Sequence, residues 1–256
     1  MGNADSPNPG LADVVTIDGP SGAGKGTVAG LLAARLGWHL LDSGALYRVV
    51  GVVAERRGVD LADADALADM ARGLDIAFTE SVTDDAVSVA VVVDGTDETS
   101  AIRAAEAEDP ASRVAAVTDV RTVLGDVQRS FRRPPGLVAD GRDMGTVVFP
   151  DARLKIFLTA SVGVRAERRM RQLAADRRRL KDQHAGDSLR APRGDSAAAL
   201  TAVRARTEAR DQRDRTRDVS PLVPATDAVT IDSTALSIDS VMTEVMALVR
   251  KRGLDR

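Results

Sequence analysis

The sequence predicts an α/β protein in which a parallel sheet is flanked by helices. Short runs of β-branched residues alternate with stretches of helical spacing, a pattern typical of a doubly wound sheet. Hydrophobic residues make up 44% of the chain but aromatic residues only 2%. The core must therefore consist of Val, Leu, Ile and Ala, which suits a buried parallel sheet. In such sheets ligands bind at the carboxyl ends of the strands.

The N-terminal region predicts two units of a strand followed by a helix. Val14 to Asp18 is the first strand, and after a glycine-rich segment Val28 to Leu36 has helical spacing. Trp38 to Leu41 is the second strand. The next helix runs from Ser43 to about Arg57, and Ser43 is expected to cap it.

The middle of the chain predicts a small antiparallel insertion and then a return to the core. A helix from Asp63 to Arg72 precedes two β-rich segments that turn residues separate. Two helices are expected between Ala104 and Phe131, followed by two core strands. The β-rich segments are Leu74 to Phe78 and Ala86 to Val93, and the core strands are Leu137 to Asp140 and Leu154 to Leu158.

The last third of the chain predicts helices around a polar loop. A helix is expected through Arg171, but Asp176 to Asp195 has little apolar periodicity and predicts a mobile loop. Ala197 to Arg215 returns to a helix, Ala228 to Ile231 is a last strand and Ser237 to Arg250 a last helix. The N-terminal residues 1–13 predict a disordered tail.

Charge is unevenly distributed. Between Arg165 and Arg217, fifteen Arg and one Lys stand against eight Asp or Glu, a local balance of +8 in a chain of net charge −3. Such a block could bind nucleic acid, or it could close over the phosphates of a small ligand. An exposed helix with i,i+4 ion pairs would explain its middle part equally well.

Other classes of site and location are limited by composition. The chain has no cysteine and only two histidines, which excludes disulfides and thiol catalysis and makes a histidine-ligated metal improbable. No apolar run approaches the roughly 20 residues of a membrane span, and the N-terminus lacks the apolar segment of a signal peptide. A cytoplasmic monomer without membrane or nucleic-acid partners is expected.

The glycine-rich segment after the first strand predicts a phosphate-binding loop. It reads GPSGAGKGT, fits the pattern G-x-x-x-x-G-K and lies between a strand and a helix. Its amides and the helix N-terminus would face phosphate oxygens, and Lys25 would add a point charge. Lysine is rare here, with four against thirty-one arginines. A structural glycine-rich turn is the alternative. The expected ATP-binding residues are Gly19, Pro20, Ser21, Gly22, Ala23, Gly24, Lys25, Gly26 and Thr27.

The residue after the lysine narrows the class. In most P-loop NTPases a Ser or Thr there holds Mg²⁺, but here Gly26 follows and Thr27 comes next. This order resembles nucleoside monophosphate kinases. The only asparagines are Asn3 and Asn8, so the Asn-Lys-x-Asp motif by which GTPases recognise their base is absent.

Four motifs in order resemble bacterial cytidylate kinase: IDGPSGAGKGT from Ile17, LLDSGALYR from Leu40, DGRDMGTVVFP from Asp140 and RDRTR from Arg213. The resemblance runs from about Val14 to Arg250. It implies a P-loop nucleoside monophosphate kinase fold with a small antiparallel β insertion and an Arg-rich lid, and transfer of the γ-phosphoryl group of ATP to CMP or dCMP, with Mg²⁺. The predicted single kinase unit, 14–250, divides into a core (14–42, 118–160 and 219–250), an acceptor-binding region (43–117) and a lid with flanking helices (161–218).

The resemblance also implies residue roles that suit the chemistry. Arginine forks grip phosphate through two hydrogen bonds, and a carboxylate facing the 4-amino group of cytosine would reject UMP. Arg48 and Arg142 would hold the acceptor phosphate, and Lys25, Arg142 and Arg217 would stabilise the transferring charge. The expected CMP-binding residues are Ser43, Arg48, Ser112, Arg121, Arg142, Asp143, Arg210, Asp214 and Arg217.

Asp140 ends an apolar strand and resembles the acid that positions Mg²⁺, through water. A helix cap or a structural turn residue is the alternative. The lid arginines Arg165, Arg168 and Arg169 are weaker candidates, since they need not all point inward.

Two other functions are alternatives. Another P-loop kinase, for UMP, AMP or a non-nucleotide acceptor, also fits the P-loop alone. A nucleic-acid-binding protein could use the Arg-rich segment, but the six aromatic residues present are too few for a platform on which bases stack.

Overall fold

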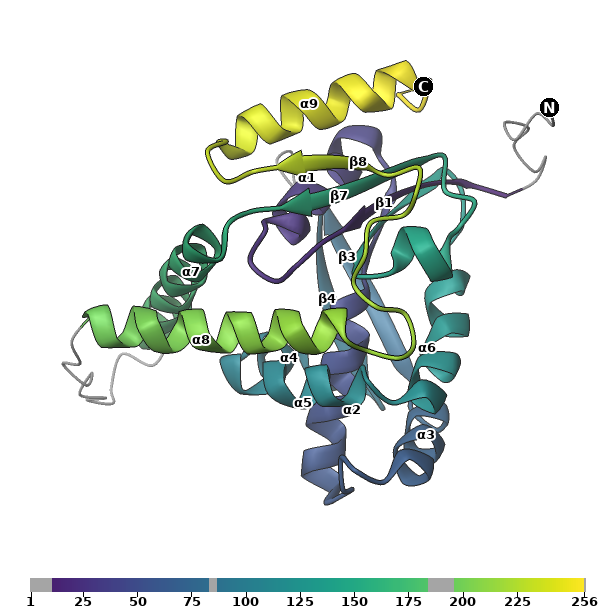
Figure 1. The fold of residues 1–256 in the computed structure, drawn as a ribbon. Helices are drawn as coiled ribbons and strands as arrows, with labels where there is room; N and C mark the ends of the chain where they lie inside the picture. Colours follow the sequence, from purple (N-terminus) through teal and green to yellow (C-terminus); the bar gives the residue numbers. More distant parts are fainter. Residues whose placement is uncertain (1–10, 83–86, 184–195, 256) are drawn as a thin grey trace.

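The computed structural model describes residues 11–82, 87–183 and 196–255, and within them the main sheet is parallel (Figure 1). Its five strands lie in the order β2-β6-β1-β7-β8. They are β1 (Asp13–Asp18), β2 (His39–Asp42), β6 (Gly136–Gly141), β7 (Leu154–Thr159) and β8 (Val229–Asp232). The predicted α/β class is confirmed.

Parallel pairing brings the functional strand ends together. β1 pairs with β6 so that Asp18 lies opposite Gly141, and β2 pairs with β6 so that Asp42 lies opposite Asp140. These central strands are almost fully buried on both sides, as expected for apolar runs in a sheet covered on two faces. The motifs that follow the three strands therefore meet at one edge.

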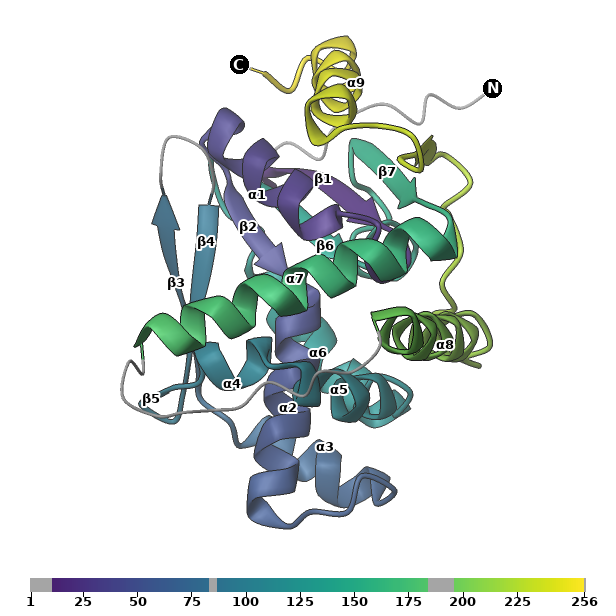
Figure 2. The same cartoon turned by 90° about the vertical axis from the view of Figure 1, so that its left-hand side faces the viewer.

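Helices cover the sheet and build a second layer beside it. The N-terminal and middle ones are α1 (Lys25–Leu36), α2 (Ser43–Arg57), α3 (Ala64–Arg72), α4 (Thr99–Arg103), α5 (Glu108–Val114) and α6 (Thr118–Ser130). Those that follow β7 are α7 (Val162–Gln183), α8 (Ser196–Arg215) and α9 (Ile238–Lys251). α1 packs on β6 and α9, while α2 contacts α3, α4 and α5. Helices α7 and α8 contact each other and extend away from the sheet (Figures 1 and 2).

The predicted antiparallel insertion is confirmed. It consists of β3 (Ile76–Val82), β4 (Val87–Val93) and the short β5 (Thr96–Asp97), paired in that order. β4 contacts both β2 and α1, so the insertion lies at the β2 edge of the main sheet (Figure 2).

Three details of the sequence prediction are wrong. The cap of α2 is not Ser43, which is already helical, but Asp42, whose carboxylate accepts from the amide of Ala45 at 3.1 Å. The helix expected to end at Arg171 continues to Gln183, so the first part of the predicted loop is helical; residues 184–195 lie outside the described ranges, as do residues 1–10 of the predicted tail. Asp13, expected in that tail, already belongs to β1.

Some short elements were not anticipated. α4, a single 3₁₀ turn η1 (Ala105–Ala107) and a π-helical turn η2 (Met144–Val148) have no apolar periodicity that sequence could reveal. η2 packs on β1 and β6 and contacts α6. No helix in the described ranges is both long and apolar enough to cross a membrane.

Candidate active site

The P-loop lies where the sequence places it, between the end of β1 and the start of α1. Gly22 and Gly24 have φ of +76° and +97°, angles that L side chains rarely adopt. A Cβ at Gly19 would lie 2.0 Å from the carbonyl oxygen of Leu158, so the loop runs close over β7. A loop of this shape directs backbone amides toward one point in front of α1.

Lys25 bends back over the P-loop. Its Nζ donates to the carbonyl of Pro20 at 3.1 Å and lies 3.8 Å from a carboxylate oxygen of Asp140. Burial, together with nearby Arg142, lowers its pKa from 10.5 to about 8, although Asp140 opposes this shift. The ammonium therefore gains from any further negative charge that enters the site.

The carboxylate of Asp140 lies beside Lys25 and close to Gly26, at whose position most P-loops have a Ser or Thr. A Cβ on Gly26 would lie 3.3 Å from Asp140 Oδ2, so a Ser or Thr directly after Lys25 would crowd the acid. Burial raises the pKa of Asp140 while Lys25 lowers it. Among the residues described, no group of three or more His, Cys, Asp or Glu side chains could hold a metal, so a cation here would need ligands from a substrate as well.

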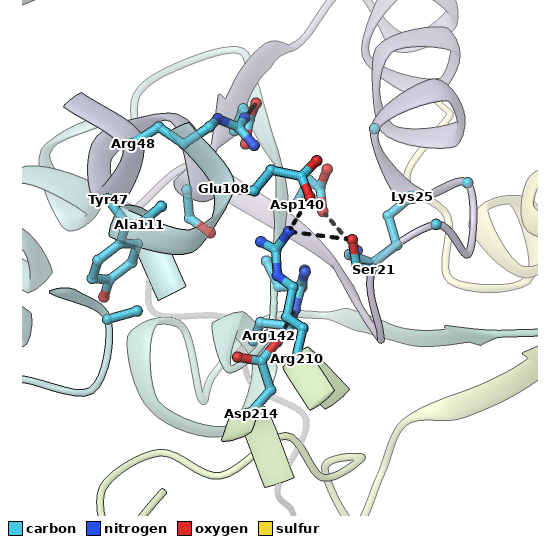
Figure 3. A pocket seen from close by; sticks show the side chains of 18 of the residues that line it. Ser21, Lys25, Tyr47, Arg48, Glu108, Ala111, Asp140, Arg142, Arg210 and Asp214 are labelled. Atoms are coloured by element: carbon cyan, nitrogen blue, oxygen red, sulfur yellow. Dashed lines mark hydrogen bonds and ion pairs between the residues drawn. The ribbon is translucent and has the colours of Figure 1, made fainter. Parts of the chain in front are cut away.

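A cavity of about 770 Å³ opens between the P-loop and α2 (Figure 3). Seven basic and five acidic side chains line it, which leaves an excess of positive charge. The basic ones are Lys25, Arg48, Arg121, Arg142, Arg169, Arg210 and Arg217, and the acidic ones are Asp42, Glu108, Asp140, Asp143 and Asp214. In Figure 3 Arg142 and Arg210 lie between Lys25 on one side and Arg48 on the other.

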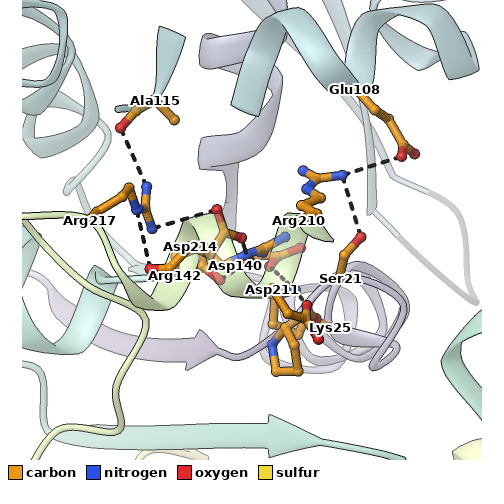
Figure 4. A network of polar contacts seen from close by, with 12 residues as sticks. Ser21, Lys25, Glu108, Ala115, Asp140, Arg142, Arg210, Asp211, Asp214 and Arg217 are labelled. Carbon is orange, nitrogen blue, oxygen red and sulfur yellow. Dashed lines mark hydrogen bonds and ion pairs between the residues drawn. The ribbon is translucent and has the colours of Figure 1, made fainter. Parts of the chain in front are cut away.

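Several of these arginines are held by acids from other elements. Arg142 Nε donates to Asp214 on α8 at 3.0 Å, and Arg48 donates to Asp42 at 2.7 Å. Arg210 reaches Ser21 of the P-loop and Glu108 of α5, each at 3.4 Å (Figure 4). Burial and the neighbouring Arg142 lower the pKa of Arg210 to about 10. Guanidinium groups so close to one another are stabilised when an anion binds between them.

One end of the cavity is built around a buried ion pair. Arg121 on α6 donates to Asp143, which follows β6, and their side chains are 8% and 4% exposed. The ring of Tyr47 lies 5.6 Å from the Arg121 guanidinium carbon, a cation–π distance. Ser43 is buried beside them at the start of α2. Hydrogen-bond acceptors and donors thus lie side by side at this end of the cavity.

Unpaired donors in this region are the feature that most needs an explanation. Among the described residues, four buried guanidinium nitrogens on arginines of the cavity make no hydrogen bond: Arg48 Nε, Arg121 Nε, Arg210 Nε and Arg217 Nη2. The last of these lies 3.9 Å from Asp214 Oδ1, an ion-pair distance only. Each such group costs about 1–3 kcal/mol if it stays unsatisfied. Buried polar atoms are normally paired, so these nitrogens point to a ligand rich in acceptors.

The model of the cytidylate kinase family matches residues 15–251 of the chain. The cytidylate kinase of Stutzerimonas stutzeri is 48% identical over 241 residues, which cover 94% of this chain and 96% of that protein. The cytidylate kinases of Pseudomonas fluorescens and Aeromonas hydrophila are also 48% identical, over 95% of this chain and 98% and 96% of theirs. The chain belongs to the cytidylate kinase family. The resemblance found in the motifs is confirmed.

Most residues that the sequence singled out for the acceptor of a cytidylate kinase lie together at the cavity. Ser43, Arg48, Arg121, Arg142, Asp143, Arg210, Asp214 and Arg217 all line it. Ser112 does not: it lies on α5 between the lining residues Ala111 and Ala115, and its hydroxyl is buried without a hydrogen bond. Of the arginines in the RDRTR motif, only Arg217 enters the cavity, since Arg213 is exposed and pairs with Asp109.

The weaker lid candidates have different positions. Arg165 is buried against Asp211 of α8 and donates to the carbonyl of Ser21 at 2.9 Å. Arg168 donates to the carbonyl of Ala23 at 3.1 Å. Both side chains therefore hold backbone carbonyls of the P-loop. Of the three lid candidates, only Arg169 lines the cavity. In this family member the basic block is thus partly a support for the P-loop.

Sequence reasoning missed the second hollow of the site. A cavity of about 850 Å³ lies on the other side of the P-loop, between the start of α7 and residues 233–238, which lead into α9. Arg168 Nη2 donates to the carbonyl of Ser233 at 2.7 Å and so ties the two walls together. Residues 233–238 carry no motif, and only their position behind the P-loop marks them.

Proposed function

We propose that the chain transfers the γ-phosphoryl group of ATP to CMP or dCMP, giving CDP or dCDP and ADP. The observation that supports this most is the cavity between the P-loop and the buried Arg121–Asp143 pair, in which four buried guanidinium nitrogens of described residues make no hydrogen bond. Phosphoryl transfer depends on charge neutralisation and in-line positioning. The acceptor phosphate would lie between Lys25 and the arginines, and the pyrimidine would lie beside the Arg121–Asp143 pair. This arrangement would provide both the neutralisation of charge and the positioning.

The donor nucleotide would bind across the P-loop. The amides of residues 19–27 and the N-terminus of α1 would hold its phosphates, and Lys25 would bridge to the group being transferred. The cavity beside residues 233–238 is open to the same loop, so it offers room for the base and sugar of ATP.

The acceptor would bind on the α2 side. Arg48, Arg142 and Arg210 surround the space in front of Lys25, which suits the acceptor phosphate, and Arg217 would join them with Asp214 near the sugar. Asp143 would accept from the 4-amino group of cytosine and Arg121 would donate toward N3 and O2. No general base is needed, because the acceptor phosphate is already ionised near neutral pH.

The residues present fit a magnesium ion that arrives with ATP. Asp140 lies beside Lys25 and close to Gly26, and Mg²⁺ is commonly bound by one or two carboxylates plus substrate phosphates and waters. When bound, the ion would neutralise charge on the β and γ phosphates. Asp140 would hold it through water.

The test is an ADP-release assay with CMP, dCMP, UMP and AMP as acceptors at fixed ATP and Mg²⁺. CMP and dCMP should be turned over far better than UMP or AMP, and Lys25→Ala should reduce turnover at least about a hundredfold. Lys251→Ala, at the exposed end of α9, is the matched control. Turnover of AMP or UMP without CMP would refute the base assignment, and full activity of Lys25→Ala would refute the donor site.

A further inference from the structure

Asp18, the last residue of β1, is buried and bonded to a loop on the other side of the site. The residue as a whole is only 5% exposed. One carboxylate oxygen accepts from the amide of Met144 at 2.9 Å, and the other accepts from the amide of Gly145 at 2.8 Å. The partners are 126 and 127 residues away in the sequence. Asp18 also directly precedes the P-loop.

The two amides belong to the segment that carries the acceptor-side groups. Arg142 and Asp143 come immediately before Met144, and the π-helical turn η2 starts there. This segment is tightly packed, because a Cβ at Gly141 would lie 2.6 Å from Met144 Cγ and 2.7 Å from Ser43 Oγ. A shift of Met144 would therefore move the backbone of Asp143.

A carboxylate suits this position in a way that an amide does not. Two N–H groups point at the two oxygens of Asp18, and asparagine could accept only one of them while turning its own NH₂ toward the other. Burial raises the pKa of Asp18 from 3.8 to about 7, against the lowering effect of the two amides. An ionised acid here is thus unfavourable for folding, so stability alone would favour an uncharged side chain.

We propose that Asp18 is a positioning residue for the acceptor: by holding the amides of Met144 and Gly145, it fixes Asp143 and Arg142 relative to the P-loop. The inference rests on the proposed function, which assigns base recognition to Asp143. It adds that one residue at the junction of β1 and the P-loop aligns the donor side with the acceptor side.

The first test is Asp18→Asn, with Asp13→Asn as its matched control. Asp13 begins the same strand at the end opposite the P-loop, and its side chain is 33% exposed and pairs with Arg153. In Asp18→Asn the KM for CMP should rise and the preference for CMP over UMP should fall by about ten-fold or more, since one of the two buried amides loses its acceptor. The KM for ATP should change by less than about two-fold. Asp13→Asn should leave all of these values near those of the wild type.

A second variant moves the same loop without touching Asp18. A Cβ at Gly145 would lie 2.8 Å from Thr16 Oγ1 and 3.1 Å from Lys155 Cδ, so Gly145→Ala should push the loop away from β1. It should give the same signature, and it keeps the proposal testable if Asp18→Asn does not fold. Circular dichroism and thermal unfolding confirm that each variant is folded.

Combination with Asp143→Asn separates this role from a general structural one. If Asp18 acts through Asp143, Asp18→Asn should cause little further loss of base preference in the Asp143→Asn background. Wild-type protein without CMP turnover would refute the proposed function itself. Normal wild-type turnover, with an unchanged CMP preference in folded Asp18→Asn or Gly145→Ala, would overturn only the role of Asp18.

Discussion

Replacement of Asp143 by asparagine tests how the site chooses its base. The carboxylate would accept from the 4-amino group of cytosine, whereas UMP presents a 4-oxo group to it. Asparagine keeps an oxygen for Arg121, while its NH₂ could donate to the 4-oxo group of UMP. Alanine is a poorer choice, because it would leave the buried charge of Arg121 unpaired at a cost of about 3–5 kcal/mol.

The magnitude follows from the burial of the pair. With side chains 8% and 4% exposed, the Arg121–Asp143 pair is shielded from water, so a lost hydrogen bond to the charged group is worth about 1.5–3 kcal/mol. We therefore expect kcat/KM for CMP to fall by about ten- to a hundredfold. The value for UMP should rise, which lowers the CMP/UMP ratio further.

The measurement is ADP release at saturating ATP with CMP, dCMP and UMP varied separately. Asp126→Asn is the matched control, since Asp126 lies on the same helix as Arg121 but its side chain is 85% exposed. An unchanged CMP/UMP ratio in Asp143→Asn, with thermal stability equal to the wild type, would refute the assignment of Asp143 to the base.

Three further predictions concern charge in and behind the site. The pKa of Asp18 is about 7 in the folded protein against 3.8 in its usual state, so between these values the folded protein holds a proton that the unfolded chain has lost. The contribution of Asp18 to the free energy of unfolding should thus decrease by about 2–3 kcal/mol from pH 5 to pH 8. Urea unfolding of Asp18→Asn should lack that part of the pH dependence. A pH profile identical to that of the wild type would contradict the raised pKa of Asp18. Asp211→Ala should lower the free energy of unfolding by about 3 kcal/mol or more, because it leaves buried Arg165 without its partner; a loss no larger than that of exposed Asp218→Ala would count against the pair. Asp140→Asn should raise the Mg²⁺ concentration for half-maximal turnover by about ten-fold, and EDTA should abolish turnover reversibly. An unchanged Mg²⁺ requirement in Asp140→Asn would refute the assignment of the ion to Asp140.

The donor half of the site could be predicted almost completely from the sequence. A strand, the glycine spacing of residues 19–24 and a helix that starts at Lys25 are consecutive in the chain. The geometry of such a loop depends on local φ and ψ angles, which the glycines permit. The predicted ends of the five core strands agree with the structure to within one residue, whereas β3 of the insertion ends at Val82 and not at Phe78.

Predictions failed where local pattern and helix propensity disagree. Residues from Asp176 to Asp195 show little apolar periodicity, which predicted a loop, yet the helix continues to Gln183. Arg, Lys, Leu, Ala and Gln all favour the helix intrinsically, so α7 needs no continuous buried face. Asp42 replaced Ser43 as the cap of α2, because both residue types can cap and one position is beyond the resolution of a sequence pattern.

The sequence by itself determined the α/β class, the P-loop and, through its four motifs, the family and most of the arginines that meet at the cavity. Only the tertiary structure decided which side chains line the cavity and which support the loops. Arg165 and Arg168 hold P-loop carbonyls, and Asp18 holds amides more than a hundred residues away. Such roles depend on partners that are distant in the chain. The sequence does not show whether an Asp or Arg contacts a substrate, a backbone amide or water.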